Sequence, residues 1–423
     1  MQYYNVHTHS FTMNNAPKDF LQLYLPKAVA NLVDKITDVQ AGSWLIQKIL
    51  ENVGGNGGKR YASFLKIGKS RNQLEVFRQL KDQYKDTSFK FVALTMEMEQ
   101  CGAGKSSSGY EGQLEEIISV KKQFPDNLLL FLGIDPRWKS NGFELRDTVI
   151  KYFEQKIDVG NNRTVYPFVG LKMYPSMGFY PFDEKLKPTF AWAAENNVPV
   201  LSHCNFLGGI YNNDAGFINT IIKSNDPYNG NAMYPPNGVT YSDQKKFGRW
   251  IMGRQKSRNN LNRCSYFMEP YAFYTLMDYF KKNGTPLKLC LAHFGGGNQI
   301  NAILKPEKAD EEDLRPYGAK NENWYTQIKS MMTEFPSLYT DISYALADET
   351  IHDQMIADIQ NPSYAGRVMF GTDYFLTERE GPEMGTYEKF RHDASVSGNA
   401  WDIAAHYSIE KFLGGSKYFQ PTP

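Results

Sequence analysis

The feature that most constrains the fold is a series of eight short runs rich in β-branched and aromatic residues, spread along the whole chain. Most of them are continuously hydrophobic instead of alternating with polar residues, which is typical of strands covered on both faces. We predict that these runs are strands. They are Gln2–His9, Phe89–Met98, Asn127–Asp135, Phe168–Tyr174, Val198–Cys204, Leu287–Phe294, Leu338–Tyr344 and Val368–Tyr374.

Between these runs lie segments with the residue spacing of amphipathic helices. The clearest are Glu111–Gln123, Phe143–Lys156, Pro188–Asn196, Pro270–Lys282, Trp324–Glu334 and Ile351–Gln360. Strands that alternate with helices form parallel β-α units, and eight such units close most economically into a (β/α)8 TIM barrel, an α/β fold. An open doubly wound sheet is the alternative, but no Gly-x-Gly-x-x-Gly turn follows an early strand. We therefore predict the barrel.

Two long segments interrupt the alternation, one after the first strand at residues 11–88 and one after the fifth strand at residues 205–263. Loops that follow barrel strands lie at the carboxyl end, where active sites are built. We expect both inserts to begin there, either as a lid or substrate wall or as regions without a catalytic role. We predict a single barrel domain over residues 1–423.

The composition, with 41% hydrophobic and 22% charged residues, is typical of a soluble globular protein. The formal net charge of +1 gives no reason to expect nucleic acid or a membrane surface as a partner. No apolar run approaches the roughly 18 residues that span a bilayer, and no signal peptide is visible. The four cysteines are widely separated, as expected for reduced thiols in a cytoplasmic protein. We expect a small-molecule substrate, and a homo-oligomer is compatible with the sequence.

Polar residues that can bind a metal ion or a proton recur toward the carboxyl ends of the predicted strands. His7 and His9 lie two residues apart on the first strand, so an extended backbone points both side chains to one side. The fifth and sixth strands end near His203 and His293, and the eighth ends near Asp373. Each residue alone has an ordinary structural explanation. Parallel strands of a barrel bring all of them to one rim, so we predict a single site there.

These motifs resemble those of the amidohydrolase superfamily, in particular its amidohydrolase-related branch of TIM-barrel hydrolases, which includes small-acid decarboxylases and lactonases. The matching stretches lie between residue 1 and about residue 376, and they are His7-Thr8-His9, Gly170-Leu171-Lys172-Met173-Tyr174-Pro175, Ser202-His203, Ala292-His293-Phe294-Gly295-Gly296 and Phe370-Gly371-Thr372-Asp373. Each motif is common by itself, whereas the combination is specific to this superfamily. Members with an appended β-sandwich usually have chain before the first strand, whereas here that strand begins at residue 2, so the resemblance implies a barrel without a separate β-sandwich.

The resemblance implies a divalent metal ion, commonly zinc, bound by His7, His9, His203 and Asp373. Neutral imidazoles and a carboxylate suit zinc, and a catalytic site leaves one position for water. Such an ion lowers the pKa of its bound water toward neutrality. The resemblance also implies that Asp373 carries a proton from this water to the leaving group, and that His293 stabilises the oxyanion.

Lys172 within the fourth strand leaves the number of metal ions open. In superfamily members with two ions, a lysine at this place is carboxylated and bridges them, and His203 and His293 then hold the second ion. In members with one ion, the lysine is unmodified and serves the substrate or the internal ion pairs. The Met173-Tyr174-Pro175 context resembles the second group more closely, so we favour one ion.

Three further residues near the strand ends are candidates for roles around the substrate. Arg137 follows the third strand, and its guanidinium could clamp a substrate carboxylate through two hydrogen bonds; a surface ion pair is the alternative. Tyr174 is a candidate hydrogen-bond partner of the substrate or a packing residue. Asp341 is expected to orient the site from behind the ligands.

The sequence therefore predicts a metal-dependent hydrolase that activates water on a divalent ion to cleave an amide, ester or lactone bond of a small molecule. The first alternative is a metal-dependent, non-oxidative decarboxylase of a small carboxylic acid, which the same branch contains. An additional Arg or His that grips a carboxylate near the metal would favour that reaction. An alternative of another class is a non-catalytic barrel that binds a metal or a saccharide.

Overall fold

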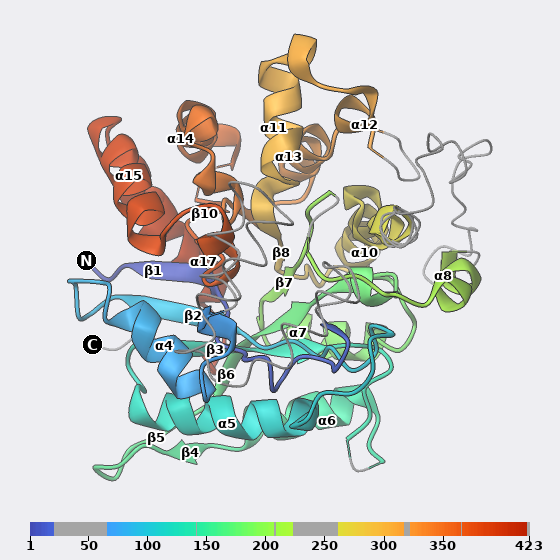
Figure 1. Cartoon of the computed structure of the whole chain (residues 1–423), viewed down its shortest axis with the longest axis vertical. Helices are drawn as coiled ribbons and strands as arrows, with labels where there is room; N and C mark the ends of the chain where they lie inside the picture. Colours follow the sequence, from blue (N-terminus) through green and yellow to red (C-terminus); the bar gives the residue numbers. More distant parts are fainter. Residues whose placement is uncertain are drawn as a thin grey trace.

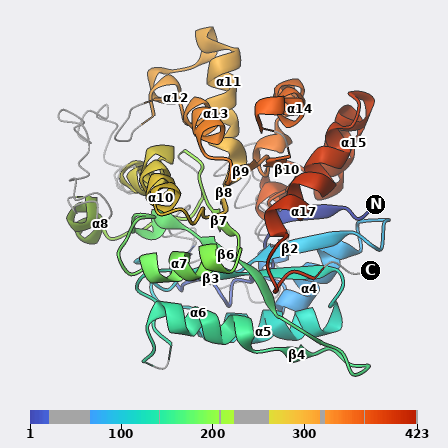
Figure 2. The same ribbon diagram turned by 180° about the vertical axis from the view of Figure 1, so that it is seen from behind.

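The computed structural model of the chain describes residues 1–20, 66–140, 142–206, 209–222, 261–316, 322–364 and 366–420. Within them, eight parallel strands form one sheet that curls into a nearly closed barrel, and helices surround it (Figure 1 and Figure 2). In sheet order the strands are β1 (Tyr4–Thr8), β2 (Lys90–Leu94), β3 (Leu128–Ile134), β6 (Phe168–Met173), β7 (Val200–Ser202), β8 (Leu289–Leu291), β9 (Leu338–Asp341) and β10 (Val368–Met369). The predicted α/β barrel is confirmed.

Contacts between β1 and the chain that follows β10 close the ring. The backbone N–H of Asp373 donates to the carbonyl oxygen of His7 at 2.8 Å. Just beyond this bond, Thr8 and Tyr374 form a parallel bridge. The first and last strands therefore end side by side, as all neighbouring strands of a barrel do.

The strands are joined through helices on the outer face of the barrel, as the alternation in the sequence predicts. The helices are α4 (Gln73–Lys81), α5 (Gly109–Gln123), α6 (Leu145–Glu154), α7 (Lys187–Glu195), α8 (Ala215–Ile222), α10 (Pro270–Lys282), α11 (Gly297–Leu304), α12 (Glu311–Leu314), α13 (Trp324–Glu334), α14 (His352–Gln360), α15 (Glu383–Val396), α16 (Ala400–Asp402) and α17 (Ser408–Leu413). A two-stranded antiparallel ribbon of β4 (Ile157–Asp158) and β5 (Thr164–Val165) connects α6 to β6.

Short helical turns occupy several of the loops. The 3-10 turns are η3 (Pro175–Met177), η5 (Ala292–Phe294), η6 (Pro306–Lys308), η7 (Ala345–Ala347), η8 (Glu349–Ile351), η9 (Pro362–Tyr364) and η10 (Leu376–Arg379), and a π-helical turn, η11 (Ile403–Tyr407), precedes α17. No helix among the described residues is both long enough and apolar enough to span a bilayer.

The observed elements agree with the predicted ones, with two kinds of difference. α10 and α13 have the predicted bounds, whereas the strands are shorter at their carboxyl ends. There the chain leaves the sheet to form the rim on which the predicted site residues lie. α15 and α17 lie where we predict no helix. α15 has only a weak apolar stripe, so helical periodicity does not reveal it.

The two predicted inserts are described only in part. α4 lies inside the range 11–88 and packs against α5, and the bounds of this insert stay a prediction. α8 lies inside the range 205–263. Residues 21–65, 207–208 and 223–260 of the two inserts lie outside the described residues. In the described part of the chain, the sheets are the barrel and the β4–β5 ribbon.

Side chains fill the barrel, and the C-terminal helix covers its amino end. Phe131 and Met369 are fully buried in one hydrophobic cluster with Phe412 of α17. Lys288, just before β8, donates to the carbonyl oxygen of Gly414 at 2.5 Å, which ties the end of α17 to the amino end of a strand. The amino end of the barrel is therefore packed, and the carboxyl ends of the strands carry the polar rim.

Gly170 on β6 makes room for the Phe131 ring of β3 inside the barrel. A methyl group at Gly170 would lie 2.4 Å from the Cζ atom of Phe131, much closer than carbon atoms approach without bonding. We expect Gly170→Ala to lower the free energy of unfolding by about 1–3 kcal/mol through overpacking, as measured by urea denaturation. Gly381→Ala is the control, because its methyl group would meet nothing closer than 3.5 Å. Equal stabilities of the two variants would contradict this account.

Candidate metal centre

The two histidines of β1 are held in the same tautomer by their hydrogen bonds. His7 and His9 are buried. Nδ1 of His7 lies 3.0 Å from a carboxylate oxygen of Asp341, and Nδ1 of His9 lies 3.2 Å from the carbonyl oxygen of Leu94. Both partners accept hydrogen bonds, so each Nδ1 carries the proton and donates it. Each Nε2 then keeps a free lone pair, the form in which a neutral imidazole binds a metal ion.

Asp373 faces both of these nitrogen atoms from the segment after β10. Its Oδ1 lies 3.4 Å from Nε2 of His7 and 3.2 Å from Nε2 of His9. Gly371 permits this close approach, since a methyl group there would lie 2.8 Å from the Cβ of His7. Asp373 has a φ of 63°, a left-handed backbone conformation that residues other than glycine rarely adopt. The backbone therefore turns sharply to bring the carboxylate over β1.

These three atoms present only lone pairs to one another. Nε2 of His7 and Oδ1 of Asp373 are buried and have no hydrogen-bond partner among the described residues. Such an arrangement is unfavourable by itself, because burial removes water and nothing replaces it. A divalent cation would satisfy all three atoms, and imidazole nitrogen with carboxylate oxygen is a donor set that suits zinc. The residues therefore fit the predicted metal ion.

His293 lies next to this group, and His203 is one hydrogen bond farther away. Potential ligand atoms of His7, His293 and Asp373 all lie within 4.8 Å of one another. Nδ1 of His293 donates to the carbonyl oxygen of Ser343 at 2.9 Å, while its Nε2 lies 3.0 Å from Nδ1 of His203. His203 thus contacts another histidine in this structure, and its role as a metal ligand stays a prediction.

Tyr174 packs against His203. The two rings are stacked, with centroids 4.2 Å apart and an angle of 11° between their planes. The Tyr174 hydroxyl accepts a hydrogen bond from the backbone N–H of Ile210 at 3.0 Å. These contacts show how Tyr174 supports the position of His203, and its predicted contact with the substrate stays a prediction.

Arg137 forms an ion pair in this structure. Its Nε donates to Oδ1 of Asp135 at 2.7 Å, and its Nη2 donates to the carbonyl oxygen of Met177 at 2.9 Å. Of the two predicted roles of Arg137, a clamp for a substrate carboxylate and an ion pair, the structure shows the ion pair. A substrate carboxylate would have to replace Asp135 before Arg137 could clamp it.

The charges in the site favour neutral imidazoles beside an ionised carboxylate. Burial, together with the nearby Lys172, lowers the pKa of His7 to about 3. Burial also lowers the pKa of His293. Burial alone would raise the pKa of Asp373, but the neighbouring histidines outweigh it and hold this pKa below its usual value. These are the protonation states that metal binding requires.

Lys172 on β6 is a buried amine beside this group. Its Nζ has no hydrogen-bond partner among the described residues. Burial lowers its pKa to about 8, although the carboxylates of Asp373 and Asp341 act in the opposite direction. A fraction of this amine is neutral near pH 7, which suits carboxylation by carbon dioxide as well as service as an unmodified amine. Both predicted roles of Lys172 stay open.

Asp341 and Ser343, at the end of β9, orient the histidines from behind. Asp341 accepts hydrogen bonds from Nδ1 of His7 and from the backbone N–H of His293, each at 3.0 Å, which agrees with its predicted role. Ser343 donates its own N–H to Asp341 at 3.0 Å. The Ser343 hydroxyl lies 3.0 Å from Nδ1 of His7 and 2.9 Å from Nδ1 of His293, and it donates to Asp341. Sequence reasoning does not identify Ser343, because these contacts join residues of separate strands.

A second buried network supports Asp373 from α15. Glu383 accepts hydrogen bonds from the Tyr84 hydroxyl at 2.6 Å and from the Thr372 hydroxyl at 2.9 Å. The side chain of Asn5 on β1 donates to the same Thr372 hydroxyl at 2.7 Å. The network thus ties the residue before Asp373 to the first strand. No sequence signal identifies it, because its members are far apart in the chain.

Comparison with known proteins places the chain in a family. The sequence model of a family described as amidohydrolase matches residues 162–390. No curated protein matches the sequence. One similar solved structure is an uncharacterized TIM-barrel protein from Bordetella bronchiseptica, with 11% sequence identity, a TM-score of 0.47 and a match over 98% of this chain and 99% of that chain. A second is a probable 2-pyrone-4,6-dicarboxylic acid hydrolase from Acinetobacter baumannii with bound citric acid, with 9% identity, a TM-score of 0.47 and a match over 98% of this chain and 100% of that chain. A third is an amidohydrolase from Burkholderia multivorans with bound zinc, with 8% identity, a TM-score of 0.48 and a match over 98% of this chain and 99% of that chain.

The family match covers more than half of the chain, from β5 into α15, and it includes His203, His293 and Asp373. The chain therefore belongs to the amidohydrolase family. It is an enzyme of the amidohydrolase superfamily, and this family is metal-dependent. His7 and His9 precede the matched residues, so their place in the site rests on the geometry described above.

We expect Asp341→Asn to weaken zinc binding by about 10–100-fold without unfolding the protein. The amide of the substituted side chain has one accepting oxygen, so it cannot accept hydrogen bonds from both Nδ1 of His7 and the backbone N–H of His293. The proton on Nδ1 of His7 is then no longer fixed. Competition with a chromogenic chelator measures the affinity, and circular dichroism reports the fold. Asp393→Asn is the control, because Asp393 also contacts a histidine, His352 at 2.8 Å, but outside the metal centre. Unchanged affinity in Asp341→Asn would show that this carboxylate does not orient the ligands.

Glu383 gives a pH-dependent test of the second network. Burial raises its pKa to about 7 from an ordinary value of 4.5. The folded state therefore holds this proton longer than the unfolded state, and stability is lost as the pH rises through that interval. Glu383→Gln keeps an acceptor for Tyr84 and Thr372 but cannot ionise. Relative to the natural protein, we expect it to gain up to about 3 kcal/mol between about pH 5 and pH 8, measured by urea unfolding. A difference independent of pH would contradict the assignment.

Proposed function

We propose that this protein is a metal-dependent hydrolase that cleaves an amide, ester or lactone bond of a small molecule. The observation that carries the proposal is the meeting of three lone-pair atoms, Nε2 of His7, Nε2 of His9 and Oδ1 of Asp373, in a buried site. This site lies at the carboxyl ends of the strands, where barrel enzymes carry out their chemistry. Membership of the amidohydrolase family supports the same reaction class.

We assign one metal ion, with zinc as first choice, to His7, His9, Asp373 and a third histidine. The resemblance points to His203 as that histidine, whereas His293 is the one closer to the group in this structure. When bound, the ion acidifies water and polarises the substrate carbonyl.

The side chains of the site supply the proton transfers. Asp373 is ionised, and as the general base it takes a proton from the attacking water and returns it to the leaving group. His293 keeps its proton on Nδ1, where Ser343 accepts it. It can therefore donate to an oxyanion through Nε2 only after taking up a second proton. His203, whose Nδ1 lies 3.0 Å from that Nε2, is the neighbouring group through which this proton can pass.

Decarboxylation is less well supported than hydrolysis. It needs a cation that holds a substrate carboxylate beside the metal, and Arg137 is already paired with Asp135 at 2.5 Å. Lys172, which lies close to His7 and Asp373, is another cation that could hold a substrate carboxylate. The experiment must therefore measure hydrolysis and decarboxylation together.

We expect protein purified without chelators to contain one metal ion per chain, as measured by elemental analysis. Removal of the metal ion should abolish the hydrolysis of a panel of lactones, esters and amides. Asp373→Asn should fold normally and lose about 10²–10⁴-fold in rate, because the general base is gone. Asp393→Asn, an acid on α15 outside the site, is the control and should keep its rate.

Isotope labelling separates the two reactions. Hydrolysis incorporates heavy oxygen from labelled water into the product, whereas carbon dioxide release without water uptake would replace the hydrolase with a decarboxylase. Two metal ions per chain, together with the added mass of carbon dioxide on Lys172, would overturn the single-ion assignment. A normal rate in Asp373→Asn would show that the proton carrier is a different residue.

A further inference from the structure

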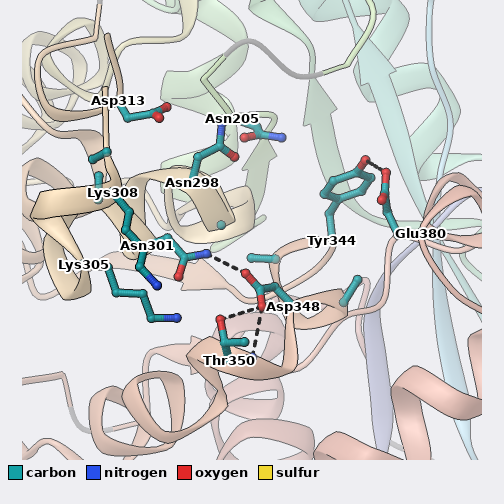
Figure 3. Close-up of a pocket in the computed structure, with 15 residues that line it drawn as sticks. Asn205, Asn298, Asn301, Lys305, Lys308, Asp313, Tyr344, Asp348, Thr350 and Glu380 are labelled. Carbon is teal, nitrogen blue, oxygen red and sulfur yellow. Dashed lines mark hydrogen bonds between the residues drawn. The ribbon is translucent and has the colours of Figure 1, made fainter. Parts of the chain in front are cut away.

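A cavity of about 610 Å³ opens beside the metal centre. It lies among the segments that follow β7, β8, β9 and β10, and residues of α11, η6, η7 and η8 contribute to its wall (Figure 3). Its volume is in the range of roughly 300–1,000 Å³ that is usual for small-molecule sites. None of the predicted metal ligands is among the residues that line it.

Two contacts connect the cavity to the metal centre. Tyr344 lines the cavity, and its ring centroid lies 6.4 Å from that of His293. Asn205 also lines the cavity, and it follows His203 by two residues and pairs with Gly295 in a parallel bridge. The Tyr344 ring is therefore part of the cavity wall and also lies close to His293.

The wall of the cavity combines hydrogen-bonding groups with apolar surface in nearly equal measure. Amide, ammonium, carboxylate and hydroxyl groups come from the ten residues labelled in Figure 3, and the other lining residues are glycine and alanine. Small-molecule sites ordinarily have a mainly hydrophobic wall with few polar groups. An apolar ring or chain would strip water from these groups without replacing its hydrogen bonds. The cavity thus favours a ligand that is itself rich in hydrogen-bonding groups.

The charges of the wall are mixed and nearly cancel. Two ammonium groups, from Lys305 and Lys308, stand against three carboxylates. The carboxylates are oriented by neighbours: Asp348 accepts from the amide of Asn301 at 2.5 Å, and Glu380 accepts from the Tyr344 hydroxyl at 2.7 Å (Figure 3). A polyanion such as a phosphate ester would meet as much repulsion as attraction here.

We propose that this cavity binds the hydroxyl-rich part of the substrate, a polyol group that is neutral or singly charged. The inference rests on the proposed function, since it places the bond to be cleaved at the metal centre and the hydroxyl groups beyond Tyr344. A hydroxyl donates one hydrogen bond and accepts others, so it matches a wall where Asp348 stands near Asn301 and Lys305. Tyr344, held by Glu380, is then the specificity-determining residue between the two parts.

A matched pair of probes tests the proposal on the metal-loaded protein. D-glucitol and hexane-1,6-diol have the same carbon chain and no charge, and they differ in the number of hydroxyl groups. Ligand-observed nuclear magnetic resonance titration measures their dissociation constants. We expect D-glucitol to bind about tenfold more tightly or better, and Lys305→Met or Asn298→Leu to remove about a tenfold factor by deleting a hydrogen-bonding group.

Lys122→Met, at an exposed position of α5, is the control and should bind D-glucitol like the natural protein. Equal affinities for the two probes, or D-glucitol binding that is unchanged in both cavity variants, would overturn the proposal. Circular dichroism excludes unfolding as the cause of a loss, and the two cavity variants are independent of each other.

Failure of the cavity proposal can be told apart from failure of the proposed function. D-glucitol should still bind after the metal is removed, because no metal ligand lines the cavity. Intact binding in a protein that shows neither metal nor hydrolysis would refute the proposed function and, with it, the assignment of the cavity to a substrate. Metal-dependent hydrolysis without preferential D-glucitol binding would refute the cavity proposal alone.

Discussion

The metal centre depends on the closure of the barrel between its first and last strands. The backbone N–H of Val6 donates to Phe370 at 3.0 Å, and that of Asp373 donates to His7 at 2.8 Å. These bonds set the register that places the Asp373 carboxylate beside the imidazoles of β1. A slip of one residue would turn side chains of β1 to the other face, and the three lone pairs would no longer meet.

The backbone of the site adopts strained conformations that the surrounding fold must stabilise. Left-handed backbone occurs at the ends of three neighbouring strands, with φ of 66° at His293, 59° at Tyr344 and 63° at Asp373. Each such conformation costs about 1–3 kcal/mol and persists only when its surroundings leave no alternative. Two buried carboxylates supply this support from opposite sides, Asp341 behind the histidines and Glu383 behind the residue before Asp373.

The two ends of the barrel have different tasks. At the amino end, α17 packs its Phe412 into the interior cluster, so this end contributes stability. At the carboxyl end lie the histidines and the aspartate of the candidate metal centre. The cavity next to it is built from loop segments that follow β7, β8, β9 and β10, and such segments ordinarily carry the specificity of a rigid scaffold. This separation explains how one superfamily can serve several reactions and many substrates.

Sequence alone determined the barrel and the residue types at its rim, because strand periodicity and the order of parallel β-α units are read from local patterns. Which of these residues meet depends on the three-dimensional fold. It placed His293 nearer to His7 and Asp373 than His203, paired Arg137 with its neighbour Asp135, and brought the hydroxyl and carbonyl of Ser343 behind the histidines. Such distances join side chains from separate strands, and they depend on register, tilt and closure, which no local pattern encodes.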